Sequence, residues 1–242
     1  APPHVSIRPW CEFEPTQRVI LRPTRDIGAF HTELIKALSG HVTMVSVLHS
    51  TGHKVLMKNA LHKASVPLAN IEFLDVDATD SVWTRDYGPI PIVSSEGDIA
   101  FVDFRYYHDR THDDAVPTKL AAHWGTNVYR PTLGIEGGNL MTDQYGTCFA
   151  TEKLFTQNAG WSTAQVEQWT QEYLGCRQLV ILKRPEELGT GHIDMFCKLM
   201  DDRTVVLGTY DPKIRPTNAA ILDENEAILE SVITQGGETL TV

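Results

Sequence analysis

Three short segments of the sequence contain side chains suited to chemistry, and each offers a carboxylate or an imidazole. The segments are WTRDYGP (83–89), EGGN (136–139) and GHID (191–194). In the third segment His192 and Asp194 are two residues apart, so their side chains would share one face of an extended strand. A carboxylate beside an imidazole raises the pKa of that imidazole and suits it to acid–base chemistry.

The other two segments add the carboxylates of Asp86 and Glu136. Carboxylates that face one another repel unless a cation lies between them, and a planar guanidinium offers paired N–H donors that match carboxylate geometry. A metal ion is the alternative cation, but Mg²⁺ and Ca²⁺ sites usually show denser acidic loops, and zinc requires a third strong ligand. We therefore expect a guanidinium site without a metal or another cofactor, and a metal-dependent hydrolase built on His192, Asp194 and Asp86 is the rival hypothesis.

A repeated pattern of elements follows the three segments. Each segment leads into a predicted β-hairpin, and a predicted helix and a short strand follow each hairpin. The hairpins cover 88–107, 138–155 and 192–210, the helices 113–125, 162–175 and 218–237, and the strands 127–131, 177–185 and 238–242. The helices are predicted to begin at Asp113, Ser162 and Asn218 and to end at Gly125, Gly175 and Gly236.

The N-terminal third of the chain repeats this organisation less regularly. Strands are expected at 18–23, 42–50 and 71–76, with helices at 28–40 and 54–65 between them. The chain therefore contains about four units of ββαβ type, and a ring of such units would close the sheet edges that one unit leaves open. In a ring, the starts of the hairpins would gather at one end of the central axis, which would bring the three segments together.

Composition narrows the classes of function. The 242 residues are 42% hydrophobic, which is enough for a sizeable core. The formal net charge of −10 argues against nucleic acid and anionic membrane surfaces as partners, and no apolar run reaches the roughly 18 residues of a membrane span. Cys11, Cys148, Cys176 and Cys197 have no zinc spacing, so we expect buried thiols, and a disulfide among them stays open.

The ordered motifs resemble a known enzyme family. WTRDYGP, EGGNLMTDQYGT (136–147) and GHIDMF (191–196), with CEFEPTQRVIL (11–21) before them, resemble the bacterial-type peptidylarginine deiminases and their kin, the agmatine deiminases. The resemblance implies an α/β propeller of five ββαβ units, the pentein fold, of which about four are present. Residues 1–242 would then form a single deiminase catalytic domain that is incomplete at its C-terminal side.

The resemblance also implies roles for individual residues. Asp86 and Asp194 match the carboxylates that hold the substrate guanidinium, and His192 matches the general acid and base. Trp83 matches a residue that packs near the substrate stem, and Glu136 would line the pocket.

The segment DFRYYHDRTHDD (103–114) stands where bacterial peptidylarginine deiminases bind the carboxylate of a C-terminal arginine. Arg110 is our choice for that contact, with Arg105 as the second choice.

In this family a cysteine thiolate attacks the guanidinium carbon, ammonia leaves, and water hydrolyses the covalent thiouronium. That cysteine belongs to the fifth unit, and none of the four cysteines here stands in its motif. Cys197 follows Asp194 by three residues, which on a strand turns it to the opposite face. We therefore expect residues 1–242 to be inactive alone, and a second chain could supply the missing unit.

The leading hypothesis is hydrolytic deimination of a peptidyl or C-terminal arginine to citrulline and ammonia. The alternatives are an agmatine deiminase that produces N-carbamoylputrescine and a non-catalytic relative that binds arginine. The substrate is in each case a small molecule or peptide with a guanidinium group. We expect a secreted or periplasmic protein, because the N-terminus resembles a processed one, or a cytoplasmic protein if agmatine is the substrate.

Overall fold

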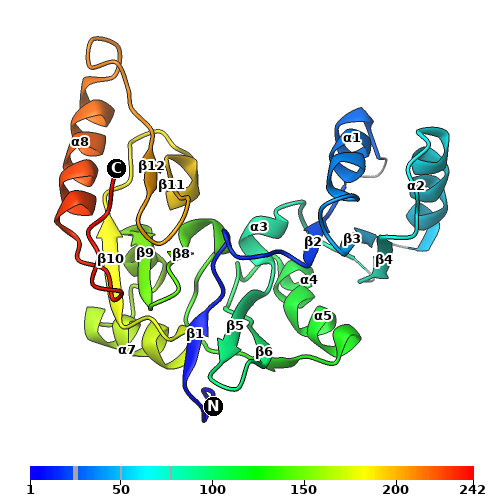
Figure 1. The fold of residues 1–242 in the computed structure, drawn as a ribbon, viewed down its shortest axis with the longest axis horizontal. Coiled ribbons are helices and arrows are strands. Elements are labelled where there is room, and N and C mark those ends of the chain that lie inside the picture. The colour runs from blue at the N-terminus through cyan, green and yellow to red at the C-terminus, as the bar shows by residue number, and fades with distance from the viewer. Residues whose placement is uncertain (24–26, 50, 77) are drawn as a thin grey trace.

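The structure is a computed structural model that describes residues 1–23, 27–49, 51–76 and 78–242 (Figure 1). The described residues form four small β-sheets, with helices packed outside them. Units built on these sheets follow one another along an arc, with the N-terminal unit at one end and the C-terminal unit at the other. The fold is therefore of the mixed α/β class that the sequence predicts.

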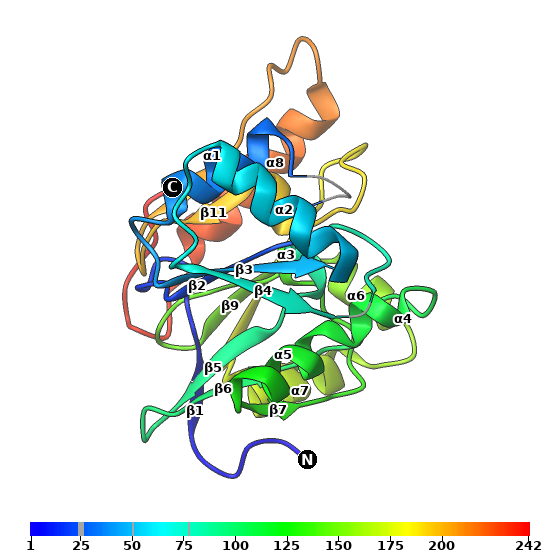
Figure 2. The same cartoon turned by 90° about the vertical axis from the view of Figure 1, so that its right-hand side faces the viewer.

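The first unit is a parallel sheet with the strand order β2–β3–β4. Figure 2 shows its two helices together on one side of that sheet. The helices bury Ile35, Met57 and Leu61 completely, so this unit has an apolar core of its own. The expected alternation of strand and helix is confirmed, although Ser50 lies outside the described residues. The elements are β2 (Arg18–Leu21), α1 (Ala29–Leu38), β3 (Met44–His49), α2 (Thr51–Lys63) and β4 (Ile71–Asp75).

The second unit is a four-stranded sheet with the order β1–β5–β6–β7. The predicted hairpin forms as β5 and β6, and β7 joins β6 in parallel after the helices. The strand β1, which the sequence analysis did not predict, pairs antiparallel with β5. The elements are β1 (Ile7–Pro9), α3 (Thr84–Tyr87), β5 (Ile90–Ser94), β6 (Ile99–Val102), α4 (Thr111–Asp114), α5 (Val116–Trp124) and β7 (Asn127–Tyr129).

The third and fourth units repeat this plan with shorter strands. In the third, β8 and β9 form the hairpin and β10 pairs in parallel with β9. In the fourth, β11 and β12 form the hairpin, but the predicted strand 238–242 makes only isolated bridges at Thr239 and Thr241. The elements are η1 (Gly137–Asn139), β8 (Met141–Thr142), β9 (Thr147–Thr151), α6 (Lys153–Gln157), α7 (Thr163–Leu174), β10 (Gln178–Leu182), η2 (Ile193–Met195), β11 (Cys197–Leu199), β12 (Val205–Leu207) and α8 (Pro216–Ser231).

The predicted helix ends are partly confirmed. Ser162 caps α7 in a capping box with Gln165, and Gly125 and Gly175 end α5 and α7 in the left-handed conformation.

The predicted starts at Asp113 and Asn218 are wrong, because both residues lie inside helices and are buried. Their side chains instead bind backbone groups that are distant in sequence but close in space. Asp113 accepts hydrogen bonds from the N–H groups of Asp80 and Ser81, and Asn218 pairs with the backbone of Glu186. The predicted end at Gly236 is also wrong, because α8 stops at Ser231.

Apolar clusters join neighbouring units into one structure. One cluster brings Leu74 of the first unit against Tyr87 and Leu120 of the second. Similar clusters join the second unit to the third and the third to the fourth. Among the described residues, none of the helices combines the length and apolar character that a membrane-spanning segment requires.

Candidate functional site

The three segments singled out in the sequence come together around Gly138. A Cβ atom placed on this glycine would lie 2.6 Å from both Oδ1 of Asp86 and Nδ1 of His192, and 2.9 Å from Oδ2 of Asp194. The three side chains belong to α3, to the residue before η2 and to η2 itself. Groups from three distant places in the sequence therefore face one point on the backbone, where only a glycine leaves them room.

His192 and Asp194 reach this point from a turn and not from a strand. The sequence analysis placed them on an extended strand, but η2 is a single 3₁₀ turn and β11 begins only at Cys197. Gly191 precedes the turn in the left-handed conformation, which a strand could not continue. The expected proximity of the two side chains therefore arises from a different local structure.

Asn139 holds the turns η1 and η2 together. Its buried Oδ1 atom accepts hydrogen bonds from the backbone N–H groups of Thr151, at 3.0 Å, and Ile193, at 3.2 Å. The hydroxyl of Thr151 donates to the carbonyl oxygen of Gly191 at 2.7 Å. Because these groups are buried, they depend on one another for their hydrogen bonds, and the segments that carry His192 and Gly138 keep a fixed spacing.

His192 lies between two carboxylates and is almost fully buried. Nδ1 lies 3.3 Å from Oδ1 of Asp86, and Nε2 lies 2.8 Å from Oε2 of Glu136. Burial acts to lower the pKa of His192, but the hydrogen bonds to Asp86 and Glu136 outweigh it and raise the pKa to about 9. The imidazole therefore carries a proton at neutral pH and can donate it to a leaving group.

Glu136 lies behind His192 and is completely buried. Burial would raise its pKa, but contacts with His192, Lys153 and Tyr107 lower the pKa to about 2. Its Oε2 atom accepts from both cations, while Oε1 is buried and has no hydrogen-bond partner among the residues that the structure describes. The structure thus places Glu136 as the inner partner of the imidazole and not on an open pocket wall.

Lys153 and Tyr107 belong to the same cluster, and the sequence analysis missed both. Nζ of Lys153 lies 2.9 Å from Nε2 of His192 and donates to the hydroxyl of Tyr107 at 3.2 Å. Lys153 is the first residue of α6 and lies outside the three motifs. A single lysine at the start of a short helix carries no signal in the sequence, because lysine at such a position is usually in solvent.

Asp194 faces Asp86 across the point occupied by Gly138. Burial raises the pKa of Asp194, and the neighbouring charge of Asp86 raises it further, while His192 acts in the opposite direction. Two carboxylates that destabilise each other in this way gain from a cation placed between them. A planar guanidinium can pair with both because it presents several N–H donors in one plane.

The two outer residues predicted from the sequence flank the cluster. Trp83 precedes α3 and has 56% of its surface exposed. The guanidinium of Arg110 lies 5.1 Å from the ring centre of Tyr107 and donates to the hydroxyl of Tyr106 at 3.1 Å. Two residues, Tyr107 and Lys153, therefore lie between Arg110 and His192 in this chain of contacts. Arg105, the second choice, is exposed and bridges Gly134 through its backbone.

The four cysteines divide into a disulfide and two buried thiols. Cys148 in β9 and Cys176 after α7 form a disulfide with a Cα–Cα distance of 5.6 Å, so the expectation of buried thiols is wrong for this pair. Cys11 and Cys197 are free and buried as expected. Burial raises the pKa of Cys11, and it raises the pKa of Cys197 to about 12. A buried thiol with a raised pKa is a poor nucleophile.

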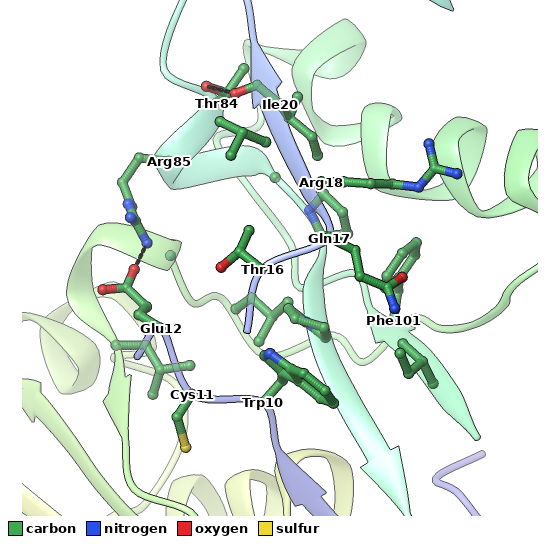
Figure 3. Close-up of a pocket in the computed structure, with 18 of the residues that line it drawn as sticks. Trp10, Cys11, Glu12, Thr16, Gln17, Arg18, Ile20, Thr84, Arg85 and Phe101 are labelled. Carbon is green, nitrogen blue, oxygen red and sulfur yellow. Dashed lines mark hydrogen bonds and ion pairs between the residues drawn. The ribbon is translucent and has the colours of Figure 1, made fainter. Parts of the chain in front are cut away.

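A separate cavity of about 700 Å³ lies on another side of α3 (Figure 3). Arg85 lines this cavity and contacts Glu12, which also contacts Lys198. Asp86, the next residue, is not among the lining residues and faces His192 instead. The short helix α3 therefore directs Arg85 to this cavity and the adjacent Asp86 to His192. Among the described residues, no three His, Cys, Asp or Glu side chains are grouped so that they could hold a metal ion.

The fold resembles that of solved structures described as agmatine deiminases. The structure described as "Agmatine deiminase of Enterococcus faecalis catalyzing its reaction" has a TM-score of 0.81 and 22% sequence identity, covering 98% of this chain and 70% of that chain. The likeness at this level of identity is one of fold. In sequence, the family model of the Porphyromonas-type peptidyl-arginine deiminases matches residues 10–242, and the chain belongs to this family.

Curated relatives carry the name of agmatine deiminase. A provisionally named agmatine deiminase from Shewanella frigidimarina (strain NCIMB 400) is 26% identical over 236 residues, which cover 90% of this chain and 62% of that protein. Another from Selenomonas ruminantium is 28% identical over 207 residues, which cover 79% of this chain and 55% of that protein. The chain thus spans between half and two thirds of the length of these relatives.

Proposed function

We propose that this chain forms the guanidinium-binding part of a hydrolytic deiminase. The observation that carries the proposal is the meeting of Asp86, His192 and Asp194 around Gly138. Asp86 and Asp194 hold the guanidinium, and His192 moves protons on and off the reacting atoms. Trp83, beside the segment that bears Asp86, covers the apolar stem of the substrate.

The proposed reaction replaces one nitrogen of the guanidinium by oxygen. A cysteine thiolate adds to the guanidinium carbon, and His192 protonates the departing nitrogen, which leaves as ammonia. His192 then takes a proton from a water molecule, whose oxygen adds to the same carbon and displaces the thiol. The products are a ureido compound and ammonia, and the thiol is restored.

The nucleophile of this reaction comes from outside the four cysteines of the chain. Two of them form the disulfide, and the other two are buried with raised pKa values. We propose that a fifth unit completes the propeller and carries the thiolate, either in additional sequence or in a second chain. The lengths of the curated relatives support this proposal. Residues 1–242 then belong to a single catalytic domain and are inactive without that unit.

Two guanidino substrates are supported by different observations. Agmatine is supported by the names of the relatives, which are agmatine deiminases. A peptidyl or C-terminal arginine is supported by Arg110, whose guanidinium lies against Tyr106 and Tyr107 at the outer side of the site. A substrate carboxylate would pair with Arg110, whereas the ammonium group of agmatine would be repelled by it.

The disulfide supports a place for the protein in an oxidising compartment, such as the periplasm or the exterior of the cell. Disulfides persist there and are rare where thiols are kept reduced. A cytoplasmic location belongs with the agmatine hypothesis and would leave Cys148 and Cys176 as thiols.

Binding of guanidines to the chain tests the proposal directly. Calorimetry with agmatine and with a peptide ending in arginine should show saturable binding, which Asp194→Asn weakens by about tenfold or more, since a charge-assisted hydrogen bond is worth about 1.5–3 kcal/mol. Arg110→Gln should weaken only the arginine peptide. Absence of binding for both ligands contradicts the proposal. The intact mass of the protein from its source shows whether further sequence or a second chain is present, and binding without ammonia release in that complete form indicates a binding protein.

A further inference from the structure

Two aspartates join the chain segments that carry the two outer residues of the candidate site, Trp83 and Arg110. Asp80 lies three residues before Trp83 in the first segment (80–83), and Asp113 lies three residues after Arg110 in the second (110–113). Asp113 is completely buried, while 27% of the side chain of Asp80 is exposed. The two aspartates are 33 positions apart in sequence, yet each accepts a hydrogen bond from the backbone N–H group of the other.

The carboxylate of Asp113 binds three donors of the first segment. Its Oδ1 atom accepts hydrogen bonds from the N–H groups of Asp80, at 2.8 Å, and Ser81, at 3.2 Å. Its Oδ2 atom accepts one from the hydroxyl of Ser81 at 2.6 Å. A buried carboxylate is stable only when it is paired or hydrogen-bonded, so these bonds fix the place of the first segment against α4.

Asp80 binds the start of α4 in return. Its Oδ2 atom accepts hydrogen bonds from the N–H groups of His112, at 2.8 Å, and Asp113, at 3.3 Å. The N–H groups in the first turn of a helix have no partner within that helix, and Arg110, which precedes α4, provides no side-chain cap. Asp80 therefore caps α4 from a distant part of the chain.

The two segments carry the groups that would contact the two ends of an arginine substrate. The first continues through Trp83 into α3, where Asp86 contacts His192. The second begins at Arg110, whose guanidinium contacts the rings of two tyrosines that shortly precede it in the chain. Asp86 therefore has a support outside the first segment, whereas the position of Arg110 relative to α3 depends on how the two segments are joined.

We propose that Asp113, together with Asp80, is a positioning residue for substrate choice, which fixes the separation between Asp86, at the guanidinium, and Arg110, at the carboxylate of an arginine substrate. This inference rests on the proposed function, because both contacts with the substrate belong to it. Agmatine has no carboxylate and therefore needs only the Asp86 side. The two aspartates thus determine how well the protein binds an arginine peptide relative to agmatine.

Calorimetry with agmatine and with a peptide that ends in arginine tests the inference on the wild type and on Asp113→Ala. In the variant the affinity for the peptide should fall by about tenfold, because a charge-assisted hydrogen bond to the carboxylate is misaligned. The affinity for agmatine should stay at the wild-type value, and loss of folding would not produce this difference. Asp113→Asn keeps an oxygen for the N–H groups of Asp80 and Ser81, so it should restore most of the affinity for the peptide.

Asp80→Ala removes the same link from its more exposed partner and keeps the test valid if Asp113→Ala does not fold. The edge-to-face contact of Tyr87 with Tyr106, at 5.9 Å between ring centres, still joins α3 to the chain before Arg110 in this variant. Asp80→Ala should therefore fold and should also lose affinity for the peptide but not for agmatine.

Asp201→Ala is the matched control, because Asp201 also accepts hydrogen bonds from two backbone N–H groups and a hydroxyl, but within one turn of the fourth unit. It should bind both ligands as the wild type does. Equal weakening of both ligands, or unchanged binding of the peptide, in a folded alanine variant of Asp113 or Asp80 overturns the inference and leaves the proposed function intact. A wild type that binds agmatine alone also overturns it. A wild type that binds neither ligand contradicts the proposed function itself, and the inference with it.

Discussion

Nδ1 of His192 lies 3.3 Å from Oδ1 of Asp86, although the two residues belong to different units of the fold. Asp86 therefore has two effects: it raises the pKa of the imidazole, and it faces the point near Gly138 where we propose that a guanidinium binds. A change at Asp86 should therefore alter both the pKa of His192 and the binding of a guanidine, a combination that loss of folding would not produce.

Asp86→Asn removes the negative charge and keeps the shape of the side chain. The pKa of His192 should fall, because one of the two carboxylates that raise it is gone. Binding of agmatine should weaken by roughly tenfold to a hundredfold, the value of a charge-assisted hydrogen bond. Ring titration and calorimetry measure the two effects. Asp98→Asn, in the turn between β5 and β6, is the control, and a wild-type titration in Asp86→Asn would contradict the assignment.

The stability of the fold should decrease in alkaline solution because of His192. Its pKa is raised in the folded protein to about 9 from an ordinary value of 6.5. The protonated ring therefore stabilises the fold fully below pH 6.5, and this stabilisation is lost as the pH rises through about 9. The loss should be on the order of 3 kcal/mol, and urea unfolding at several pH values measures it.

The comparison that isolates this effect uses His192→Gln, which should lose less stability over the same alkaline range. His108→Gln, at an exposed position, should follow the wild-type curve. Parallel curves for the wild type and His192→Gln would show that the ring proton does not stabilise the fold.

Gly138→Ala should strongly weaken guanidinium binding while the protein stays folded. The added methyl group would lie 2.6 Å from Asp86 and His192 and 2.9 Å from Asp194, closer than such atoms approach. The three side chains must move apart, so the agmatine affinity should fall by about a hundredfold, the scale of a misplaced catalytic group. Gly160→Ala, where a Cβ would meet no described atom within 4 Å, should keep the wild-type affinity in the same calorimetric measurement.

Reduction should destabilise the chain through the disulfide of the third unit. Cys148 and Cys176 are 28 residues apart in sequence, and closing a loop of that length stabilises a fold by about 3–4 kcal/mol in the chain-entropy account. Urea unfolding with and without a phosphine reductant should show that difference. The double variant Cys148→Ala and Cys176→Ala should unfold at the same denaturant concentration with and without the reductant. If the reductant still destabilises this variant, the loss of stability does not come from the disulfide.

Much of this fold is predictable from local patterns. The capping box at Ser162 and the left-handed glycines Gly125 and Gly175 mark helix ends through chemistry within a few residues. Asn218 could not be interpreted in this way, because its side chain binds the distant backbone of Glu186 and not the helix that surrounds it. The strand β1 was missed for the same reason, since three residues become a strand only by pairing with β5.

The candidate site shows the same division. Asp86, His192 and Asp194 are predictable because their motifs begin repeated hairpins, and their convergence is visible around Gly138. The burial of Glu136 and the approach of Lys153 depend on how α6 packs against η1, which no spacing in the sequence encodes. The sequence therefore predicted the groups that converge on Gly138, and the structure added the groups that contact them from behind.

The close approach of Gly137 to the carbonyl oxygen of Arg85 has a consequence for mutational libraries. Every missense change of a glycine codon introduces a Cβ, so a change at residue 137 would displace the backbone of α3 and a change at residue 138 would displace the side chains of the site. A library selected for agmatine binding should therefore retain only synonymous codons at these two positions. Gly28 and Gly160, where a Cβ would meet no atom of the described residues within 4 Å, should accumulate many replacements.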